Sequence, residues 1–229
     1  MSDRRVFAIV VAAGSGDRFG GTTPKQLMEI RGTTVVQLAV AAIEAGGGVD
    51  DIVVVTRADL IERVAATVSG ARVIAGGVTR AASVRSGLAA LEGHEEDIVL
   101  VHDAARPLVG PGLVTAVVAA TRDHGAATPA LPVGDTLLEA EDGSVVAVPD
   151  RARLLRAQTP QGFLLGILRS AHDRAAADAD FEPTDDCAVV RRYRPDVRIA
   201  VIAGSDRNIK ITTPADLQIA ESILSQRGA

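Results

Sequence analysis

The sequence predicts an α/β protein whose mostly parallel sheet is flanked by helices. Short apolar runs alternate with segments of helical periodicity along most of the chain, which is the pattern of repeated βαβ units. Several of these runs are continuously apolar, as expected for strands that are buried on both faces. A Gly-rich loop and an Asp-containing loop follow two of the runs, at the edge where open sheets of this kind bind ligands.

Composition narrows the class of protein further. The chain has 229 residues, 47% hydrophobic and 23% charged, which fits one globular domain over 1–229. No apolar run reaches the roughly 18 residues of a membrane span, and the start lacks a signal-peptide pattern. The single cysteine, Cys187, excludes an internal disulfide and a four-Cys zinc site. A net charge of −5 and 2% aromatic residues disfavour a nucleic-acid binder. We therefore expect a cytoplasmic protein that acts on a small molecule, without a nucleic-acid or membrane partner.

The first part of the chain supplies most of the predicted sheet. Strands are predicted over 6–12, 52–55, 72–74, 98–101 and 126–132, and helices over 35–45, 60–68, 81–91 and 113–122. Thr34 can cap the first of these helices, and the glycines at 46–48 can end it. Alternation of this kind implies right-handed crossovers between parallel strands.

The alternating pattern breaks after Pro132. Residues 135–149 predict two short strands around the turn Glu141-Asp142-Gly143. A lone hairpin is marginally stable in water, so this one must lie against the body or against another subunit. Helices follow over 164–177 and 185–193, then a strand over 197–202. A final helix over 214–226 has Thr213, Pro214 and Asp216 placed for a capping box.

The first strand runs into a Gly-rich loop, AAGSGDR at 12–18, followed by PKQ at 24–26. Glycine N–H groups in such a loop can approach a phosphate closely. The dinucleotide fingerprint does not fit, because Phe19 stands where a third glycine is needed, and the Gly-Lys-Ser/Thr of a P-loop is absent. The loop, with Arg18 and Lys25, favours a polyphosphate ligand. The alternative is an ordinary glycine turn with surface charges.

A second candidate loop, VHDAARP at 101–107, ends another buried strand. Asp103 at this edge can hold Mg²⁺, and Arg106 can bind a phosphate with its planar guanidinium. The alternatives are a turn-capping Asp and a salt-bridged Arg. Strand alternation turns His102 to the opposite face, which favours a packed, structural role.

Lysine is rare in this chain, with only Lys25 and Lys210 among 24 basic residues. Lysine and arginine differ in shape, so the two lysines are candidates for places that a planar fork does not fit. Lys210 lies in a strand-like apolar stretch at 208–212 and faces either solvent or a ligand. The segment from Gly76 to Ser83 can offer backbone groups and a hydroxyl to a base, or can be a plain turn before a helix.

Other reaction types find no support in the sequence. No Ser-His-Asp order and no His or Cys pair indicates hydrolysis or a zinc site. The segment Thr184-Asp185-Asp186 is best explained as the cap of the following helix, and Cys187 on that helix is expected to be buried and inert.

Taken together, these motifs resemble the 2-C-methyl-D-erythritol 4-phosphate cytidylyltransferase family. The resemblance covers about residue 6 to residue 226 and keeps the order of the motifs: 12–18 with 24–26, then 77–83, 101–107 and 206–210. It implies a Rossmann-like nucleotidyltransferase fold with a protruding β-hairpin arm over 133–153. It also implies a homodimer formed through that arm, with Mg²⁺ as the cofactor. The reaction would join CTP to methylerythritol phosphate, giving the CDP-alcohol and pyrophosphate.

The resemblance also assigns roles to particular residues. Arg18 and Lys25 would stabilise charge on the α-phosphate, and Asp103 would hold Mg²⁺ beside the nucleotide. The cytosine would be contacted by Ala12, Ala13, Gly77 and Ser83, and the ribose and phosphates by Gly14, Gly16 and Ala104. Methylerythritol phosphate would be held by Arg106, Thr136, Arg151, Thr159 and Lys210. Among these, Arg151 and Lys210 would also be catalytic, and Thr136 and Arg151 would come from the second subunit. Val78 stands where some relatives carry Asp, so a side-chain contact there would be lost.

The expected chemistry explains why no general base is evident. A phosphate monoester is already anionic near neutral pH, because its second pKa is about 6. The barrier is the approach of two anions, which cations and positioning can lower. Two alternatives remain: a cytidylyltransferase for another polyol phosphate, such as ribitol 5-phosphate, and a non-catalytic nucleotide-sensing dimer.

Overall fold

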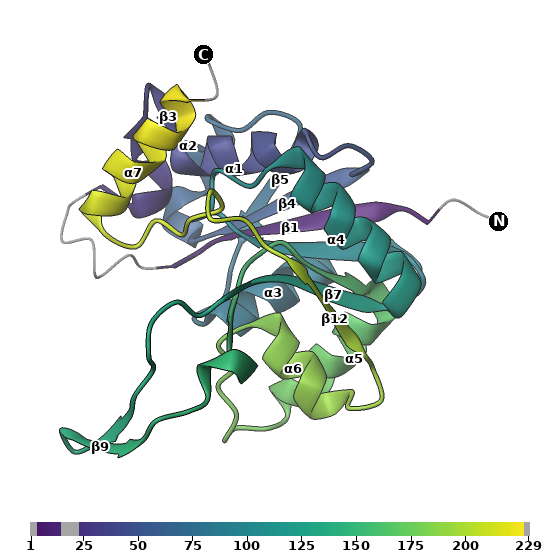
Figure 1. Ribbon diagram of the computed structural model, residues 1–229. Coiled ribbons are helices and arrows are strands. Elements are labelled where there is room, and N and C mark those ends of the chain that lie inside the picture. Colours follow the sequence, from purple (N-terminus) through teal and green to yellow (C-terminus); the bar gives the residue numbers. More distant parts are fainter. Residues whose placement is uncertain (1–3, 15–22, 227–229) are drawn as a thin grey trace.

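An eight-stranded mixed sheet forms the centre of the computed structural model, which describes residues 4–14 and 23–226. The strands of its main path run in the order β5, β4, β1, β6, β11, β7, β10, and β12 also pairs with β7. Their bounds are β1 Val6–Ala12, β4 Asp51–Thr56, β5 Arg72–Ala75, β6 Ile98–Asp103, β7 Ala126–Pro132, β10 Leu155–Ala157, β11 Gln161–Leu164 and β12 Ile199–Ala203. The predicted fold class, a mostly parallel sheet flanked by helices, is confirmed (Figure 1).

Pairing within the sheet is parallel at its centre, and the side beyond β6 combines antiparallel pairs with the parallel pair of β12 and β7. β1 pairs in parallel with β4 and β6, and β4 with β5. β11 is antiparallel to both β6 and β7, and β10 is antiparallel to β7. The sequence did not predict β10 and β11, because each is only three or four residues long, which is too short for a pattern of residue types to indicate a strand.

Helices cover the two faces of the sheet. They are α1 Val35–Glu44, α2 Ile61–Ala65, α3 Arg80–Ala89, α4 Pro111–His124, α5 Leu165–Ala176 and α6 Asp186–Tyr193, whereas α7 Pro214–Ser225 lies to one side of the sheet (Figure 1). The expected helix over 60–68 is shorter than predicted, because its start is the 3-10 turn η3 Ala58–Leu60 and it ends at Ala65. The predicted capping box at Thr213 and Asp216 is confirmed.

Alternate side chains of β1 explain why both faces need helices. Val6, Ala8 and Val10 belong to one buried cluster with residues of α1 and α4. Phe7 and Ile9 belong to a second cluster with residues of α3, α5 and α6. Since successive strand residues point to opposite faces, a continuously apolar strand must be covered twice.

A third, smaller cluster holds the C-terminal segment against the body. It joins Ile30 of the short hairpin β2–β3 (Glu29–Ile30 and Thr33–Thr34) with Val35, Leu108, Ile211 and Ala220. The predicted strand-like stretch at 208–212 is wrong, because no strand forms there. Its backbone instead donates one hydrogen bond, from the Ile211 N–H to the Ala105 carbonyl (2.8 Å), beside the end of β6.

The predicted hairpin forms and protrudes from the body. It consists of β8 Glu139–Glu141 and β9 Ser144–Ala147, all of them exposed. Asp142 and Gly143 have positive φ angles of 49° and 77°, as a tight hairpin turn requires. We call residues 139–147 the arm; Figure 1 shows it extending away from the sheet at the end of a long excursion of the chain. Within the described parts of the chain, no helix is long and apolar enough to cross a membrane.

Candidate active site

A pocket of about 150 Å³ opens where β1 and β6 end side by side. The two strands are parallel neighbours, with Val11 opposite Asp103, so the loops that follow them start from the same edge of the sheet. Six predicted site residues line this pocket: Ala12, Gly14, Lys25, Asp103, Ala104 and Lys210. Residues more than a hundred positions apart in sequence are therefore brought to one place, at the edge of the sheet where ligands are expected.

Asp103 is the centre of the polar contacts in the pocket. Its Oδ2 accepts a 2.7 Å hydrogen bond from Lys210 Nζ, and its Oδ1 lies 3.4 Å from Arg80 Nε. Burial alone would raise the pKa of Asp103, but the charges of Arg80 and Lys210 hold it well below its usual range. The carboxylate is therefore ionised at neutral pH.

Both lysines of the chain reach this pocket. Lys25 begins the 3-10 turn η2 Lys25–Leu27, directly after Pro24, and lines the wall that the first loop supplies. Lys210 enters from the C-terminal segment and pairs with Asp103. The sequence left open whether Lys210 faces solvent or a ligand, and in the structure it lines the candidate ligand pocket.

The predicted base-contacting residues gather next to the end of β1. An added Cβ at Gly76 would lie 2.7 Å from Ser83 Oγ and 2.9 Å from Ala13 Cβ, so these segments pack tightly together. The Ser83 hydroxyl is fully buried and hydrogen-bonds to the Thr79 carbonyl at 2.9 Å. A base at this place would thus meet mostly backbone groups of the segment around Gly77. Val78 is fully exposed.

A second cavity, of about 350 Å³, adjoins the pocket through Lys210, which lines both. Arg106 and Arg156 also line it. The Arg106 guanidinium donates to the carbonyls of Asn208 (2.8 Å) and Ala157 (3.2 Å), which fixes it in the wall. Arg156 is 3.6 Å from Asp206, and both side chains are mostly exposed. The sequence analysis did not single out Arg156, because one more arginine carries no signal in a chain so rich in them.

Thr159 forms hydrogen bonds with Asp103 and His102, at the start of the Asp103 loop. The Asp103 N–H donates to Thr159 Oγ1, and this hydroxyl meets His102 Nδ1, both at 3.0 Å. His102 Nε2 lies 3.0 Å from the Arg106 carbonyl, which can only accept, so Nε2 carries the proton and Nδ1 accepts. Burial lowers the pKa of His102 to about 4, so the ring is neutral. The predicted structural role of His102 is confirmed. Thr159 lines neither cavity among the described residues, and its contact with substrate stays a prediction.

The remaining predicted residues lie outside both cavities or outside the described residues. Thr136 and Arg151 are exposed on the segments that lead to and from the arm, and Arg151 Nη1 donates to the Gly134 carbonyl. Gly16 and Arg18 lie outside the described residues. The roles of these four residues stay predictions.

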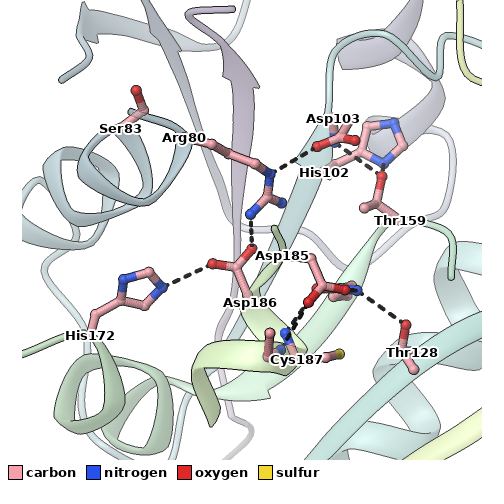
Figure 2. A network of polar contacts seen from close by, with 12 residues as sticks. Arg80, Ser83, His102, Asp103, Thr128, Thr159, His172, Asp185, Asp186 and Cys187 are labelled. Atoms are coloured by element: carbon pink, nitrogen blue, oxygen red, sulfur yellow. Dashed lines mark hydrogen bonds and ion pairs between the residues drawn. The ribbon is translucent and has the colours of Figure 1, made fainter. Parts of the chain in front are cut away.

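Sequence reasoning missed a buried ion-pair network behind the pocket, which Figure 2 shows. Arg80, at the start of α3, lies between Asp103 and Asp186, and His172 of α5 contacts Asp186 from the other side. The N-cap role predicted for Thr184-Asp185-Asp186 is confirmed for Asp185, whose carboxylate accepts a hydrogen bond from the Ala188 N–H. Asp186 is instead the buried carboxylate that contacts Arg80 and His172, and the sequence alone could not distinguish its role from that of Asp185. Cys187 is partly buried, and burial raises the pKa of its thiol well above the usual range, in agreement with an inert thiol.

Asp103 is the residue that fits a divalent cation here. The described residues contain no group of three or more His, Cys, Asp or Glu side chains that could hold a metal ion alone. Mg²⁺ that arrives with phosphates needs only one or two protein carboxylates, because phosphates and water supply the other oxygens. Asp103 is ionised, and its Oδ1 has only the long contact with Arg80. The donor set therefore fits a metal shared with a bound nucleotide.

The fold and the pocket of lysines and one carboxylate define a nucleotidyltransferase, and the comparisons with known proteins agree. The family model for 2-C-methyl-D-erythritol 4-phosphate cytidylyltransferase (IspD) matches residues 6–226. The chain belongs to this family, and it is a cytidylyltransferase. Members of the family form a cytidine diphosphate alcohol and pyrophosphate from CTP and 2-C-methyl-D-erythritol 4-phosphate.

Individual relatives support the assignment along the whole chain. The 2-C-methyl-D-erythritol 4-phosphate cytidylyltransferase of Thermobifida fusca is 42% identical, over 96% of this chain and 93% of that protein. The enzyme of the same name from Nocardia farcinica is also 42% identical, over 100% of this chain and 97% of its own length. The crystal structure of the Francisella tularensis enzyme superposes with a TM-score of 0.84 at 28% identity, covering 96% of this chain and 99% of that one.

Proposed function

We propose that the pocket at the ends of β1 and β6 is where the α-phosphate of CTP meets the phosphate of methylerythritol phosphate. One observation supports this most strongly: in a chain of net charge −5, both lysines line a single pocket together with Asp103. Two phosphates repel each other, and a site that brings them together needs cations that are already in position. The pocket concentrates such groups around one carboxylate.

The second cavity is the proposed place of the acceptor. It shares Lys210 with the nucleotide pocket and adds Arg106 and Arg156, so an acceptor phosphate there lies next to the nucleotide. Thr159 would support this place through Asp103. Thr136 and Arg151 would complete it from a second copy of the chain, since neither lines the cavity among the described residues of its own chain.

The proposed reaction is a single in-line displacement. An oxygen of the acceptor phosphate forms a bond to the α-phosphorus of CTP, while the bond from that phosphorus to the oxygen bridging to the β-phosphate breaks. Pyrophosphate leaves with the electron pair of that bond. The acceptor phosphate is already a dianion near neutral pH, so no side chain needs to remove a proton. Positioning and charge stabilisation are what the protein contributes.

Each predicted residue has a place in this scheme. Arg18 and Lys25 would stabilise charge on the α-phosphate, while Lys210 and Arg151 would position the acceptor. The cytosine would lie against the backbone of Ala12, Ala13 and Gly77 near Ser83. The ribose and phosphates would lie along Gly14, Gly16 and Ala104.

Asp103 would hold Mg²⁺ together with the phosphates of CTP. The ion would neutralise phosphate charge. Lys210 already occupies Oδ2 of Asp103, so Oδ1 is the oxygen proposed for this role.

The arm, residues 139–147, is the proposed dimer contact. It is part of a longer excursion of the chain, which we propose extends over 133–153 within a single domain over 1–229. The exposed apolar side chains Leu137, Leu138, Val145, Val146 and Val148 cluster there, and a second copy would cover them. We also propose a cytoplasmic location, which the single, unpaired thiol favours.

A pyrophosphate-release assay tests the proposal as a whole. The enzyme is given CTP, ATP, GTP or UTP with Mg²⁺, and either methylerythritol phosphate or ribitol 5-phosphate as the acceptor. We expect turnover with CTP and methylerythritol phosphate only. Faster turnover of ribitol 5-phosphate would change the acceptor, and no release with any pair would favour a nucleotide-sensing dimer.

A further inference from the structure

Arg80 is shared between two carboxylates of very different surroundings. Its Nη1 donates a 2.7 Å hydrogen bond to Asp186 Oδ2, whereas its Nε reaches Asp103 Oδ1 only at 3.4 Å. A charge-assisted hydrogen bond is normally about 2.7–2.9 Å long, so Arg80 makes a strong hydrogen bond with Asp186 and only a weak contact with Asp103. Arg80 also lines the nucleotide pocket. Its position therefore decides how much of Asp103 faces a ligand.

Asp186 is held in place from the opposite side. His172 Nε2 lies 2.9 Å from Asp186 Oδ1, and the side chains of both residues are only 1% exposed. Although burial opposes ionisation, Arg80 and His172 lower the pKa of Asp186, so it is a carboxylate that can only accept. His172 Nε2 is thus the donor, and each oxygen of Asp186 has one partner.

We infer that Asp186, held by His172, is a positioning residue that draws Arg80 away from Asp103 and leaves Asp103 Oδ1 open to a cation. Without the charge of Asp186, Asp103 is the one carboxylate among the described residues that still pairs with the guanidinium. Arg80 would then bind Asp103 through two nitrogens, the geometry that arginine and carboxylate prefer. With Lys210 already on Oδ2, both oxygens of Asp103 would be covered.

The inference rests on the proposed role of Asp103 but goes beyond it, because it places the control of that role on α5 and α6. Neither Asp186 nor His172 lines the pocket among the described residues. A residue that only supports the fold would change stability without changing how the nucleotide site responds to a divalent cation. The two roles can therefore be separated by measuring binding.

The test is calorimetric titration of the intact enzyme with CTP, in Mg²⁺ and in EDTA. The quantity compared is the ratio of the two dissociation constants, EDTA over Mg²⁺. We expect Asp186→Asn to lower this ratio by at least about fivefold, since the free energy that separates a weak from a full charge-assisted bond is about 1 kcal/mol or more. The double variant Asp186→Asn with Arg80→Gln should restore the ratio, because no guanidinium is left to cover Asp103.

A matched pair at His172 repeats the test without changing Arg80 or either carboxylate. His172→Gln keeps an N–H donor near the place of Nε2 and should keep the ratio close to that of the unmodified enzyme, whereas His172→Leu should lower it. If Asp186→Asn and His172→Leu both melt at lower temperature yet keep the ratio, the two residues are structural and the inference is wrong. Failure of the double variant to restore the ratio would also overturn it. A ratio near one in the unmodified enzyme would instead overturn the proposed role of Asp103 itself.

Discussion

Lysine and arginine are not interchangeable at the scale of single residues, and this chain places its two lysines where that difference counts. Lys25 and Lys210 line one small pocket, and a guanidinium is broader than the compact ammonium group of either lysine. Arg80 lines the same pocket but is held by Asp186, and Arg106 is held in the wall of the second cavity by two carbonyls.

We predict that Lys25→Arg loses about tenfold to a hundredfold in kcat although it keeps the charge, because the planar group cannot reach the same position. Steady-state pyrophosphate release measures the effect. Arg63→Lys is the matched control, since Arg63 is exposed on α2 and lines neither cavity, so it should tolerate the change. Near-normal turnover of Lys25→Arg would show that charge alone suffices at this position.

Thr159 is the second residue whose chemistry gives a prediction. Its hydroxyl is the shared partner of the Asp103 N–H and His102 Nδ1, both buried. Thr159→Val should lower the free energy of unfolding by about 1–3 kcal/mol, because it leaves two buried polar groups without a partner. Chemical denaturation measures the loss. Thr159→Ser keeps the hydroxyl and should recover most of the stability; an equal loss in both variants would point to packing of the methyl group instead.

Residue type alone could not separate Asp185 from Asp186. Both stand at the start of one helix, and either can cap it. Only the position of α5 and α3 around that helix puts Asp186 between His172 and Arg80, while Asp185 takes the N-cap.

At the scale of elements, the N-terminal cap of α7 lies directly after the segment that carries Lys210. Asp216 Oδ2 accepts from the N–H groups of Thr212 and Thr213, just before the helix and just after Lys210. Ala220 of the helix belongs to the same buried cluster as Ile211. The cap therefore stabilises the segment that carries Lys210 into the pocket.

We predict that Asp216→Ala lowers the free energy of unfolding by about 1 kcal/mol at neutral pH. Glu221→Ala, an exposed acid on the same helix, is the control and should change little. Burial opposes the shift, but the hydrogen bonds from Thr212 and Thr213 lower the pKa of Asp216.

The lowered pKa adds a dependence on pH. An Asp in the unfolded chain has a pKa near 3.9, so the contribution of Asp216 is complete above that value and is lost as pH falls through the lower folded value. The difference in stability between the original chain and Asp216→Ala should therefore shrink below about pH 4. Denaturation curves from pH 7 to pH 3 measure it; a constant difference would contradict the cap as its cause.

At the scale of the whole molecule, the protruding arm is the feature that gives a prediction. A hairpin whose strands are entirely exposed is not covered by the described residues of its own chain, and a lone hairpin is marginally stable in water. We predict that replacing residues 139–146 with a short Gly-Ser linker weakens dimerisation and raises KM for the acceptor much more than Kd for CTP. Sedimentation measures dimerisation, steady-state pyrophosphate release measures KM for the acceptor, and calorimetry measures Kd for CTP. The exposed Val201→Ser, on β12, is the control for lost apolar surface. Equal losses of acceptor and CTP binding would contradict a site shared between subunits.

The sequence by itself determined the main strands and helices, the hairpin with its turn, the capping box and the loops that end β1 and β6. These features depend on local periodicity, on apolar runs and on residues whose backbone preferences act over a few positions. Only the tertiary structure decided that Lys210 reaches Asp103 across 107 positions, and that Arg80 reaches Asp186 across 106. It also decided the antiparallel insertion of β11 between β6 and β7. Such contacts form because burial of the whole sheet brings distant segments together, and no local pattern specifies which charged side chains then become neighbours.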